Sequence, residues 1–252
     1  MTVASMTSAL LRVTNLTKRY NGFTAVNGVS FEVKPGEVVS LLGPNGAGKT
    51  TTIQMLLTLV APTSGEIEIF GKSLVEHREE LLSMMNFSAP YSLLPYNLTP
   101  REALAVFSML YGVRDYRQRA RVLLEEFDLE ELADRKIGKL SSGEQMRLGV
   151  AKAFVNSPRL LLLDEPTASL DPPTARQLRA KVLELIGKTG GGVLWTSHNM
   201  REVETVSNRI VFLSRGRVMA DDTPQNLKKR FGQDDLEEIF ITIAREPLRE
   251  PV

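Results

Sequence analysis

Hydrophobic and polar residues alternate in the first third of the chain as they do in strands. Residues 30–34 (SFEVK) and 66–70 (EIEIF) place apolar side chains at every second position. Residues 38–42 (VVSLL) form a short apolar run, which is typical of a strand that is buried on both faces. Residues 50–60 then follow the pattern of a helix. The pattern of this third therefore predicts several strands with one helix between them in the sequence.

The middle of the chain has few strand signals and many charges. Leu104, Phe107 and Tyr111 are spaced i, i+3 and i+7, and a second apolar stripe runs through residues 120–127. Each stripe predicts an amphipathic helix whose apolar side packs inside the protein. The pattern therefore predicts a small helical lobe over residues 88–152.

Alternation of strands and helices returns in the last third. Short apolar runs at 160–163, 193–196 and 210–213 predict buried strands, and residues 175–186 predict a helix between the first two. Strands separated by helices favour parallel pairing with right-handed crossovers. Residues 231–252 are rich in charge, and we expect them to form a frayed C-terminal tail.

Composition narrows the class of protein. The chain has 252 residues, 42% of them hydrophobic and 24% charged, which is ordinary for a globular protein and excludes a disordered one. The net charge of +1 argues against broad electrostatic capture of nucleic acid. With no cysteine and two histidines, disulfide frameworks, thiolate metal sites and multi-histidine zinc sites are excluded.

The sequence predicts neither a membrane span nor a secretory signal. No apolar run approaches the ~18 residues that a transmembrane helix needs. The first ten residues (MTVASMTSAL) lack a basic region and an apolar core. We therefore expect a soluble, cytoplasmic chain that reaches a membrane only through a partner.

A phosphate-binding pattern lies between the predicted strand 38–42 and the helix that follows. The segment GPNGAGKT fits G-x-x-x-x-G-K-[ST], in which glycines let successive backbone N–H groups point inward around an anion. Lys49 would supply charge to the phosphates and Thr50 a hydroxyl to Mg²⁺. A plain glycine turn is the alternative, and the strand and helix on either side disfavour it. The residues predicted to contact nucleotide here are Gly43, Pro44, Asn45, Gly46, Ala47, Gly48, Lys49, Thr50 and Thr51.

Two acidic residues follow four leucines at the end of the predicted strand 160–163. Ligands of open α/β sheets bind at this edge. Asp164 is placed to hold Mg²⁺, directly or through water, and Glu165, on the other side of the strand, to act as a general base on water. Apolar strands that end in an acid also occur as helix caps. The glycine loop in the same chain makes that alternative weaker.

Leu140–Glu144 (LSSGE) resembles the signature sequence of ATP-binding cassette (ABC) ATPases. The order of motifs resembles the family pattern over residues 11–230. Tyr20 precedes the glycine loop as the family's adenine-stacking aromatic does, and Asp171 lies in a segment (SLD) that resembles the aspartate loop near the nucleotide. His198, in TSH, resembles the switch histidine.

The resemblance implies an α/β fold. We expect a P-loop NTPase core with a mainly parallel sheet, an N-terminal antiparallel β portion and an inserted helical lobe. The ABC ATP-binding domain would span residues 8–230, with 8–87 and 153–230 as the nucleotide-binding core and 88–152 as the helical lobe that carries the signature.

The resemblance also assigns roles to individual residues. Ser141 and Glu144 have the spacing of a capping box, which is compatible with a functional role. In the family this helix start docks on the γ-phosphate bound by the other subunit, which implies that Ser141 and Gly143 contact nucleotide. His198 would contact the γ-phosphate and the attacking water beside the catalytic Glu165. The implied cofactors are ATP and Mg²⁺.

The chain departs from the family pattern at two places. The family usually has a Gln at the entry to the helical lobe, where it touches Mg²⁺ and reports the nucleotide state to the transporter. Residues 86–91 (NFSAPY) align Pro90 there, or Ser88 with a slip, and neither has a carboxamide. We therefore expect no metal contact from this loop and altered coupling. In the signature, Ser142 and Glu144 replace the commoner Gly and Gln.

The resemblance implies the ATP-binding and ATP-hydrolysing subunit of an ABC membrane transporter. Residues 215–231 resemble the ending of exporter-type cassettes, which favours export. The implied partners are an integral membrane permease subunit and a second ABC subunit, identical or different, with no nucleic acid. The chain would lie in the cytoplasm, peripheral on the inner face of the cell membrane, and ATP would drive closure of the dimer.

Two alternatives stay open. One is a soluble ABC ATPase that acts on nucleic acid, the ribosome or assembly factors, although no second cassette, long coiled coil or basic tail accompanies the motifs. The other is a nucleotide-binding module without turnover, which the missing Gln suggests.

Overall fold

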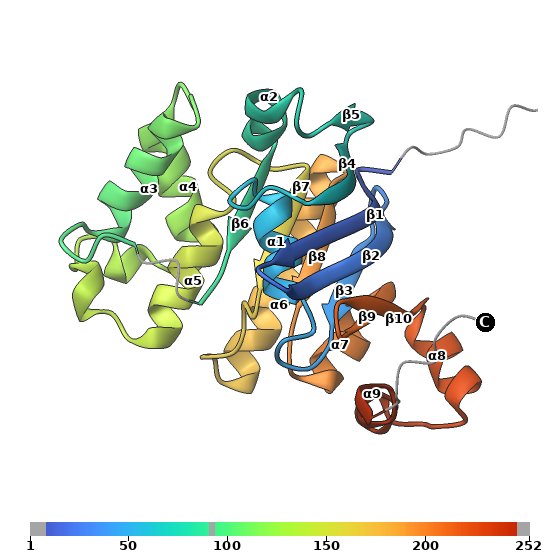
Figure 1. Ribbon diagram of the computed structural model, residues 1–252. Coiled ribbons are helices and arrows are strands. Elements are labelled where there is room, and N and C mark those ends of the chain that lie inside the picture. Colours follow the sequence, from blue (N-terminus) through green and yellow to red (C-terminus); the bar gives the residue numbers. More distant parts are fainter. Residues whose placement is uncertain (1–8, 91–93, 246–252) are drawn as a thin grey trace, which may run out of the picture. The chain divides into compact units, whose positions relative to one another are not determined.

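The computed structural model describes residues 9–90 and 94–245 (Figure 1). These residues form two compact units. The first comprises the described residues as far as Glu76 together with those from His198 onward, and the second comprises His77–Ser197. The predicted boundaries of a nucleotide-binding core and a helical lobe remain predictions.

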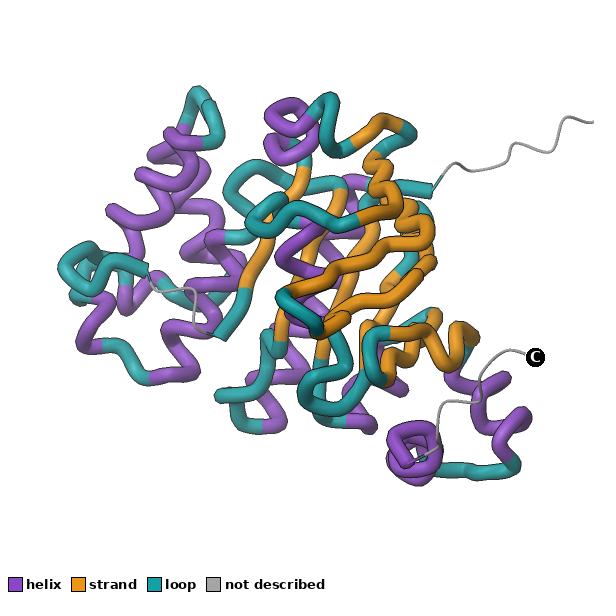
Figure 2. Tube along the Cα trace, in the orientation of Figure 1, coloured by secondary structure: helices purple, strands orange, loops and turns teal. Residues whose placement is uncertain are grey.

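An antiparallel sheet opens the first unit, as predicted. Its strands, orange in Figure 2, have the order β2-β1-β4-β5 and are β1 (Leu11–Tyr20), β2 (Phe23–Val33), β4 (Ser64–Ile69) and β5 (Lys72–Ser73). Asn21 and Gly22 join β1 to β2, and Gly22 has a φ of 85°. Only Gly22 of this pair has a positive φ, a conformation that glycine adopts in a tight turn without steric cost. Strand β2 begins seven residues before the predicted strand 30–34.

Parallel pairing also occurs in the first unit. Strand β3 (Val38–Leu42) pairs in parallel with β9 (Arg209–Ser214), and β10 (Arg217–Asp222) pairs antiparallel with β9. Every residue of β3 is buried, as its unbroken apolar pattern predicts. The helices of this unit are α1 (Lys49–Leu56), α7 (Met200–Val206), α8 (Pro224–Phe231) and α9 (Leu236–Arg245).

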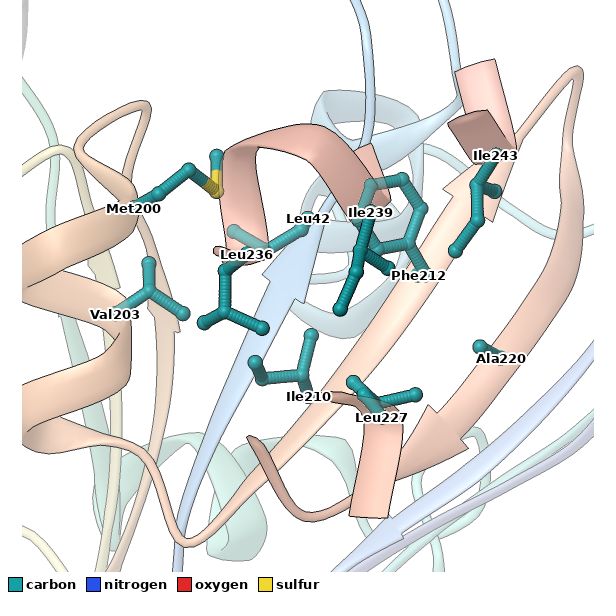
Figure 3. Packing of buried hydrophobic residues seen from close by; sticks show 10 residues of the cluster. All are labelled: Leu42, Met200, Val203, Ile210, Phe212, Ala220, Leu227, Leu236, Ile239 and Ile243. Carbon is teal, nitrogen blue, oxygen red and sulfur yellow. The ribbon is translucent and has the colours of Figure 1, made fainter. Parts of the chain in front are cut away.

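The expected frayed tail is wrong for residues 236–245, which form α9. Leu236, Ile239 and Ile243 lie at i, i+3 and i+7 and are buried against β9, β10 and α7 in one apolar cluster (Figure 3). The ring of Phe240 lies 5.2 Å from that of Phe212. Burial of this stripe stabilises a charged segment as a helix. Residues 246–252 lie outside the described residues.

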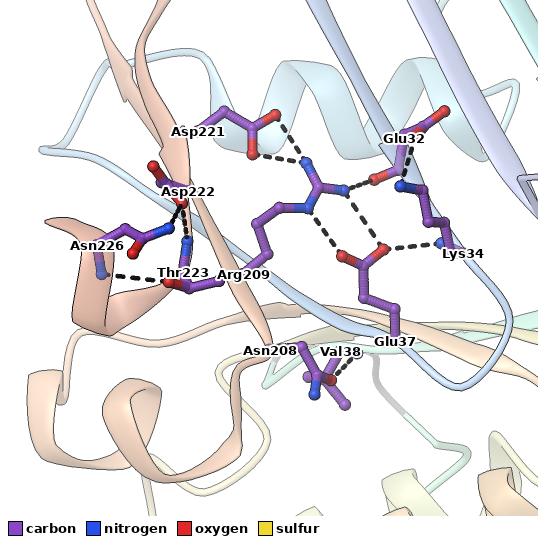
Figure 4. Close-up of polar contacts among 10 residues, drawn as sticks. All are labelled: Glu32, Lys34, Glu37, Val38, Asn208, Arg209, Asp221, Asp222, Thr223 and Asn226. Atoms are coloured by element: carbon purple, nitrogen blue, oxygen red, sulfur yellow. Dashed lines mark hydrogen bonds and ion pairs between the residues drawn. The ribbon is translucent and has the colours of Figure 1, made fainter.

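Arg209 joins several strands of the first unit (Figure 4). Its Nε donates to Glu37 Oε1 at 2.8 Å, its Nη1 donates to Asp221 Oδ1 at 2.6 Å, and its Nη2 donates to the Glu32 carbonyl at 2.5 Å. Burial opposes its charge, but the hydrogen bonds to Glu37 and Asp221 outweigh this effect and raise the pKa of Arg209. The guanidinium therefore ties β2 and the turn before β3 to β9 and β10.

We expect Arg209→Met to lower the free energy of unfolding by about 2–3 kcal/mol, because it leaves the carboxylates of Glu37 and Asp221 without the cation that they share. Urea denaturation of the full chain measures the change. Arg12→Met is the control, since Arg12 forms only exposed ion pairs and should change stability by less than ~1 kcal/mol. A loss at Arg209 no larger than that of the control would contradict a stabilising role for the cluster.

The second unit combines three parallel strands with most of the helices. Strands β6 (Met85–Ser88), β7 (Leu160–Asp164) and β8 (Gly192–Thr196) pair in the order β6-β7-β8. The helices are α2 (Arg78–Ser83), α3 (Pro100–Leu110), α4 (Tyr116–Glu126), α5 (Ser142–Lys152) and α6 (Pro172–Thr189), with 3₁₀ turns at Glu130–Leu132 and Ile137–Lys139. The predicted strands 160–163 and 193–196 are confirmed.

The helices predicted in the middle of the chain are also confirmed. Leu104 of α3 is fully buried, as are Leu123 and Leu124 of α4, while Phe107 is half-buried. Thr99 and Glu102 form a capping box at the start of α3. None of the helices in the two described ranges combines the length and the apolar character that crossing a bilayer requires. The fold is thus the predicted α/β class with parallel strands.

Candidate functional site

Glycines shape the loop that leaves β3. Gly43, Gly46 and Gly48 have φ angles of 152°, 80° and 103°, which side-chain-bearing residues rarely adopt. A Cβ on Gly43 would lie 2.2 Å from the Leu213 carbonyl oxygen, and one on Gly48 would lie 2.6 Å from that of Ala25. Only glycine can therefore occupy these two positions of the loop without a steric clash.

Lys49 curls back over this loop. Its Nζ donates to the carbonyl of Gly43 at 2.5 Å and to that of Pro44 at 3.2 Å. Gly48 is the N-cap of α1 and, within the described part of the chain, no side chain caps that helix start. Thr50, in the first turn, is exposed. The loop thus presents an ammonium, a hydroxyl and a helix N-terminus at one place, which fits a bound phosphate.

The first unit holds two more of the predicted site residues. Tyr20 ends β1 with 43% of its surface exposed, and Lys18 Nζ lies 5.0 Å from the centre of its ring. His198 is exposed beside a cavity of about 370 Å³ that Asn199 and Phe240 also line. Both side chains are accessible to a ligand, and their roles toward adenine and γ-phosphate remain predictions.

Thr196, at the end of β8, contacts both acidic residues predicted in the second unit, through the carboxylate of Asp164 and the backbone N–H of Glu165. The Thr196 hydroxyl donates to Asp164 Oδ1 at 2.5 Å and accepts from the Glu165 N–H at 3.1 Å. The Glu165 N–H also reaches the Thr196 carbonyl at 3.2 Å. No sequence motif points to Thr196, because only the parallel register, which sets Asp164 opposite Thr196, brings it to the site.

Glu165 has an unusual backbone. Its φ is 48°, in the left-handed region that costs a non-glycine residue on the order of 1–3 kcal/mol. The turn begins directly after β7 and redirects the side chain from the alternation that a continued strand would impose. Conformations of this kind persist where surrounding bonds hold them, as Thr196 does here, and they cluster at functional sites.

The signature segment forms the predicted capping box at the start of α5. Ser141 Oγ accepts from the Glu144 N–H at 3.3 Å, and Glu144 Oε2 accepts from the Ser141 N–H at 2.6 Å. This backbone hydrogen bond lowers the pKa of the Glu144 carboxyl. A Cβ on Gly143 would lie 3.2 Å from Ser169 and from Leu170, so the signature packs closely on the segment before Asp171.

Asp171 caps α6 in the same unit. Its Oδ2 accepts from the Thr174 hydroxyl at 2.7 Å, and its Oδ1 accepts from the Thr174 N–H at 3.1 Å. These bonds, the hydroxyl first, lower the pKa of the Asp171 carboxyl. The aspartate is therefore ionised and fixed next to the signature segment.

We expect Ser141→Ala to lower the free energy of unfolding by about 1 kcal/mol through loss of the cap. Ser142→Ala is the matched control, because Ser142 is exposed on the same helix and is not the capping residue. Urea denaturation of both variants measures the difference. Equal effects of the two substitutions would contradict the capping role.

The predicted site residues thus fall into two groups. The first unit carries Tyr20, the loop from Gly43 to Thr51, and His198, and the second carries Ser141, Gly143, Asp164, Glu165 and Asp171. Of the two residues aligned with the family's Gln, Ser88 is buried at the end of β6 and Pro90 is half-buried. Tyr91 lies outside the described residues.

Comparison with known proteins gives consistent matches. The family described as "ABC transporter" matches residues 26–168. The chain is 40% identical over 235 residues to the Nod factor export ATP-binding protein I of Burkholderia orbicola (strain AU 1054), with 92% of this chain and 77% of that protein covered.

Solved structures agree with the sequence matches. One, described as the ATP-binding subunit of an ABC transporter, is similar with a TM-score of 0.86 and 32% identity, and covers 94% of this chain and 100% of that one. Another, a dimeric structure of a bacterial ABC transporter cassette, has a TM-score of 0.77 and 28% identity, with 84% of this chain and 98% of that one covered.

Proposed function

The chain belongs to the ABC transporter family of ATP-binding proteins, and from that premise we propose that it is the ATP-hydrolysing subunit of a membrane exporter. The observation that carries the proposal is the glycine loop, whose close backbone contacts at Gly43 and Gly48 exclude side chains and whose Lys49 ammonium lies over it. Similarity to an export ATP-binding protein supports the direction of transport.

The first unit would bind the triphosphate. Backbone N–H groups of the loop and the start of α1 would surround the β- and γ-phosphates, and Lys49 would move from the loop carbonyls onto them. Tyr20 would stack on the adenine ring, since an aromatic face accepts any base.

A Mg²⁺ ion would accompany ATP and neutralise charge on its phosphates. The donors that this chain offers fit the metal, because Thr50 has an exposed hydroxyl and Asp164 a carboxylate, and Mg²⁺ prefers such oxygens together with water and phosphate. Thr196 donates to only one oxygen of Asp164, Oδ1, and orients the carboxylate. Asp164 is therefore the acidic residue that we assign to the metal.

Glu165 would act as the general base. The bonds from its backbone to Thr196 fix the turn after β7 and so the place from which the side chain extends, and its carboxylate would take a proton from water. His198 would hydrogen-bond the γ-phosphate and help to place that water. Both assignments follow from the match to family motifs and from the local geometry of each residue.

Two copies of the chain would pair to complete the sites. A single chain carries both a phosphate loop and a signature. A symmetric pair would therefore form two complete sites, each from the phosphate loop of one copy and the signature of the other. Ser141 is exposed at the start of α5, where a γ-phosphate bound by the other copy would meet a helix N-terminus. A related cassette has a dimeric structure, which supports this arrangement.

Binding and hydrolysis would then alternate between closed and open pairs. Each γ-phosphate contacts both copies only in the closed pair, so ATP shifts the population toward closure and hydrolysis reverses the shift. An integral membrane permease subunit would receive this motion. The chain would accordingly lie on the cytoplasmic face of the cell membrane.

The experiment is purification of the native complex from membranes in mild detergent. We expect an integral membrane protein in stoichiometric amount and an ATPase activity that Lys49→Ala abolishes. Recovery of the chain with ribosomes, nucleic acid or only non-membrane proteins would contradict the proposal and favour a cassette ATPase outside transport.

A further inference from the structure

A buried lysine ends the signature helix. Lys152, the last residue of α5, is 8% exposed, and no carboxylate among the described residues lies within ion-pair distance of it. Its Nζ donates to the Phe87 carbonyl at 2.7 Å and lies 5.3 Å and 5.8 Å from the ring centres of Phe87 and Phe107. Burial lowers the pKa of Lys152 to about 8, so the amine is still mostly charged at pH 7.

The lysine belongs to a set of bonds along the outer edge of β6. Carbonyl groups of alternate residues point the same way in a strand, and those of Met85 and Phe87 accept from Asn156 Nδ2 at 3.1 Å and from Lys152 Nζ. Asn86 accepts from the Phe87 N–H at 2.8 Å and donates to Asn156 at 2.9 Å. Side chains thus form hydrogen bonds with the backbone groups at the outer edge of β6, where no further strand pairs in the described part of the chain.

Edge protection alone does not explain the charge. At the Met85 carbonyl, the neutral amide of Asn156 supplies the hydrogen bond. The Lys152 ammonium has one hydrogen bond and two aromatic faces around it, so it loses much of its hydration. A residue that weakens the fold in this way is commonly kept for function. Lys152 is therefore a candidate for a role beyond packing.

The position of Lys152 suggests what that role is. Helix α5 begins at the signature, and its 11 residues form a rod ~16 Å long that packs directly on β6. A Cβ on Gly149 would lie 3.3 Å from Ser88 Oγ, so helix and strand are in close contact. Residues 85–90 include the two positions aligned with the family's missing Gln, where neither side chain is a carboxamide.

We propose that Lys152 is a positioning residue that transmits docking of the signature on ATP to residues 85–90. The inference rests on the proposed function, because it requires a second copy to bring its nucleotide to the start of α5. Displacement of the helix would pull on the Phe87 carbonyl through the ammonium. The rings of Phe87 and Phe107 would keep the amine at that carbonyl. A displacement of α5 would then reach Pro90 through this contact, although the Gln that the family usually has there is missing.

Hydrogen exchange of the full chain, with and without Mg²⁺ and a non-hydrolysable ATP analogue, tests the proposal. In the wild type we expect the nucleotide to slow exchange at least threefold in residues 141–145 and in residues 85–90. Lys152→Met keeps the length of the side chain but removes charge and donor, so only the effect at 85–90 should disappear. Lys152→Arg should retain both effects, and Lys188→Met, on an exposed lysine, is the matched control.

If Lys152 had only a structural role, its substitution would not abolish the nucleotide effect at residues 85–90 while keeping it at residues 141–145. Urea denaturation should show Lys152→Met to be at least as stable as the wild type, because an apolar side chain replaces an unpaired buried charge. If that variant does not fold, Lys152→Gln takes its place under the same criteria.

The inference is overturned if the methionine variant keeps the nucleotide effect at 85–90, or if the wild type lacks it while 141–145 responds. Absence of any response at 141–145 in the wild type would instead contradict the proposed pairing, and the transmission through Lys152 would fall with it.

Discussion

Glu165→Gln is expected to bind ATP and to form the closed pair, yet to hydrolyse ATP roughly 10²–10⁴-fold more slowly than the wild type, the usual loss for a general base. The amide keeps the size of the side chain and leaves the backbone bonds to Thr196 untouched. The substitution removes the negative charge of the side chain and with it the capacity to take a proton from water. Steady-state ATPase activity and nucleotide binding, measured on the same preparation, separate chemistry from affinity.

The control for this prediction is Glu131→Gln, which alters an exposed glutamate of the same unit. It should hydrolyse ATP at the wild-type rate. Full activity of Glu165→Gln would remove Glu165 from its role as the base, and loss of nucleotide binding in that variant would show that the side chain serves the fold of the site.

Lys49→Ala should weaken ATP binding by about 100-fold or more. Removal of one ammonium deletes charge-assisted hydrogen bonds to phosphate, each worth roughly 1.5–3 kcal/mol, and ~2.7 kcal/mol corresponds to that factor. The rest of the loop is held by its glycines and by the bond from the Thr52 hydroxyl to the Gly48 carbonyl, so the backbone cradle should persist.

Equilibrium binding of ATP by the purified chain measures this effect, and urea denaturation verifies that the variant is folded. Lys229→Ala, on an exposed lysine of α8, should leave affinity unchanged. Undiminished affinity of Lys49→Ala would contradict the assignment of the glycine loop to the triphosphate.

Features that depend on neighbouring residues in the sequence were predictable. Strand β3 matches its apolar run residue for residue, because a strand buried on both faces needs no alternation. The capping box of Ser141 and Glu144 depends on a spacing of three and is present as predicted. The glycine loop is likewise local, since the positive φ angles that shape it belong to glycines of one short motif.

Helix α9 shows how charge can mask a helix. Leu236, Ile239 and Ile243 had the spacing of a buried stripe, but the charges around them suggested a frayed tail. Burial against Phe212 and Leu227 decides the outcome, and that surface exists only after β9 and α8 are in place. Tertiary packing rather than propensity stabilises most helices.

Contacts between elements that are distant in the sequence were not predictable. The bond between Thr196 and Asp164 joins residues 32 positions apart and follows from the register of β7 with β8. Lys152 likewise meets Phe87 across 65 positions. The sequence supplies the chemical groups in these cases, and only the pairing of strands and helices shows which groups meet.

The most direct test of the central claim mixes two inactive variants of the chain. Lys49→Ala keeps its signature but not its phosphate loop, and Ser141→Arg keeps its loop but not its signature. In an equimolar mixture about half of the pairs would be mixed, and a mixed pair has one of its two sites complete. The mixture should therefore recover about a quarter of the wild-type ATPase rate, whereas each variant alone should be inactive. A mixture no more active than its components, or Ser141→Arg alone at the wild-type rate, would contradict a site shared by two chains.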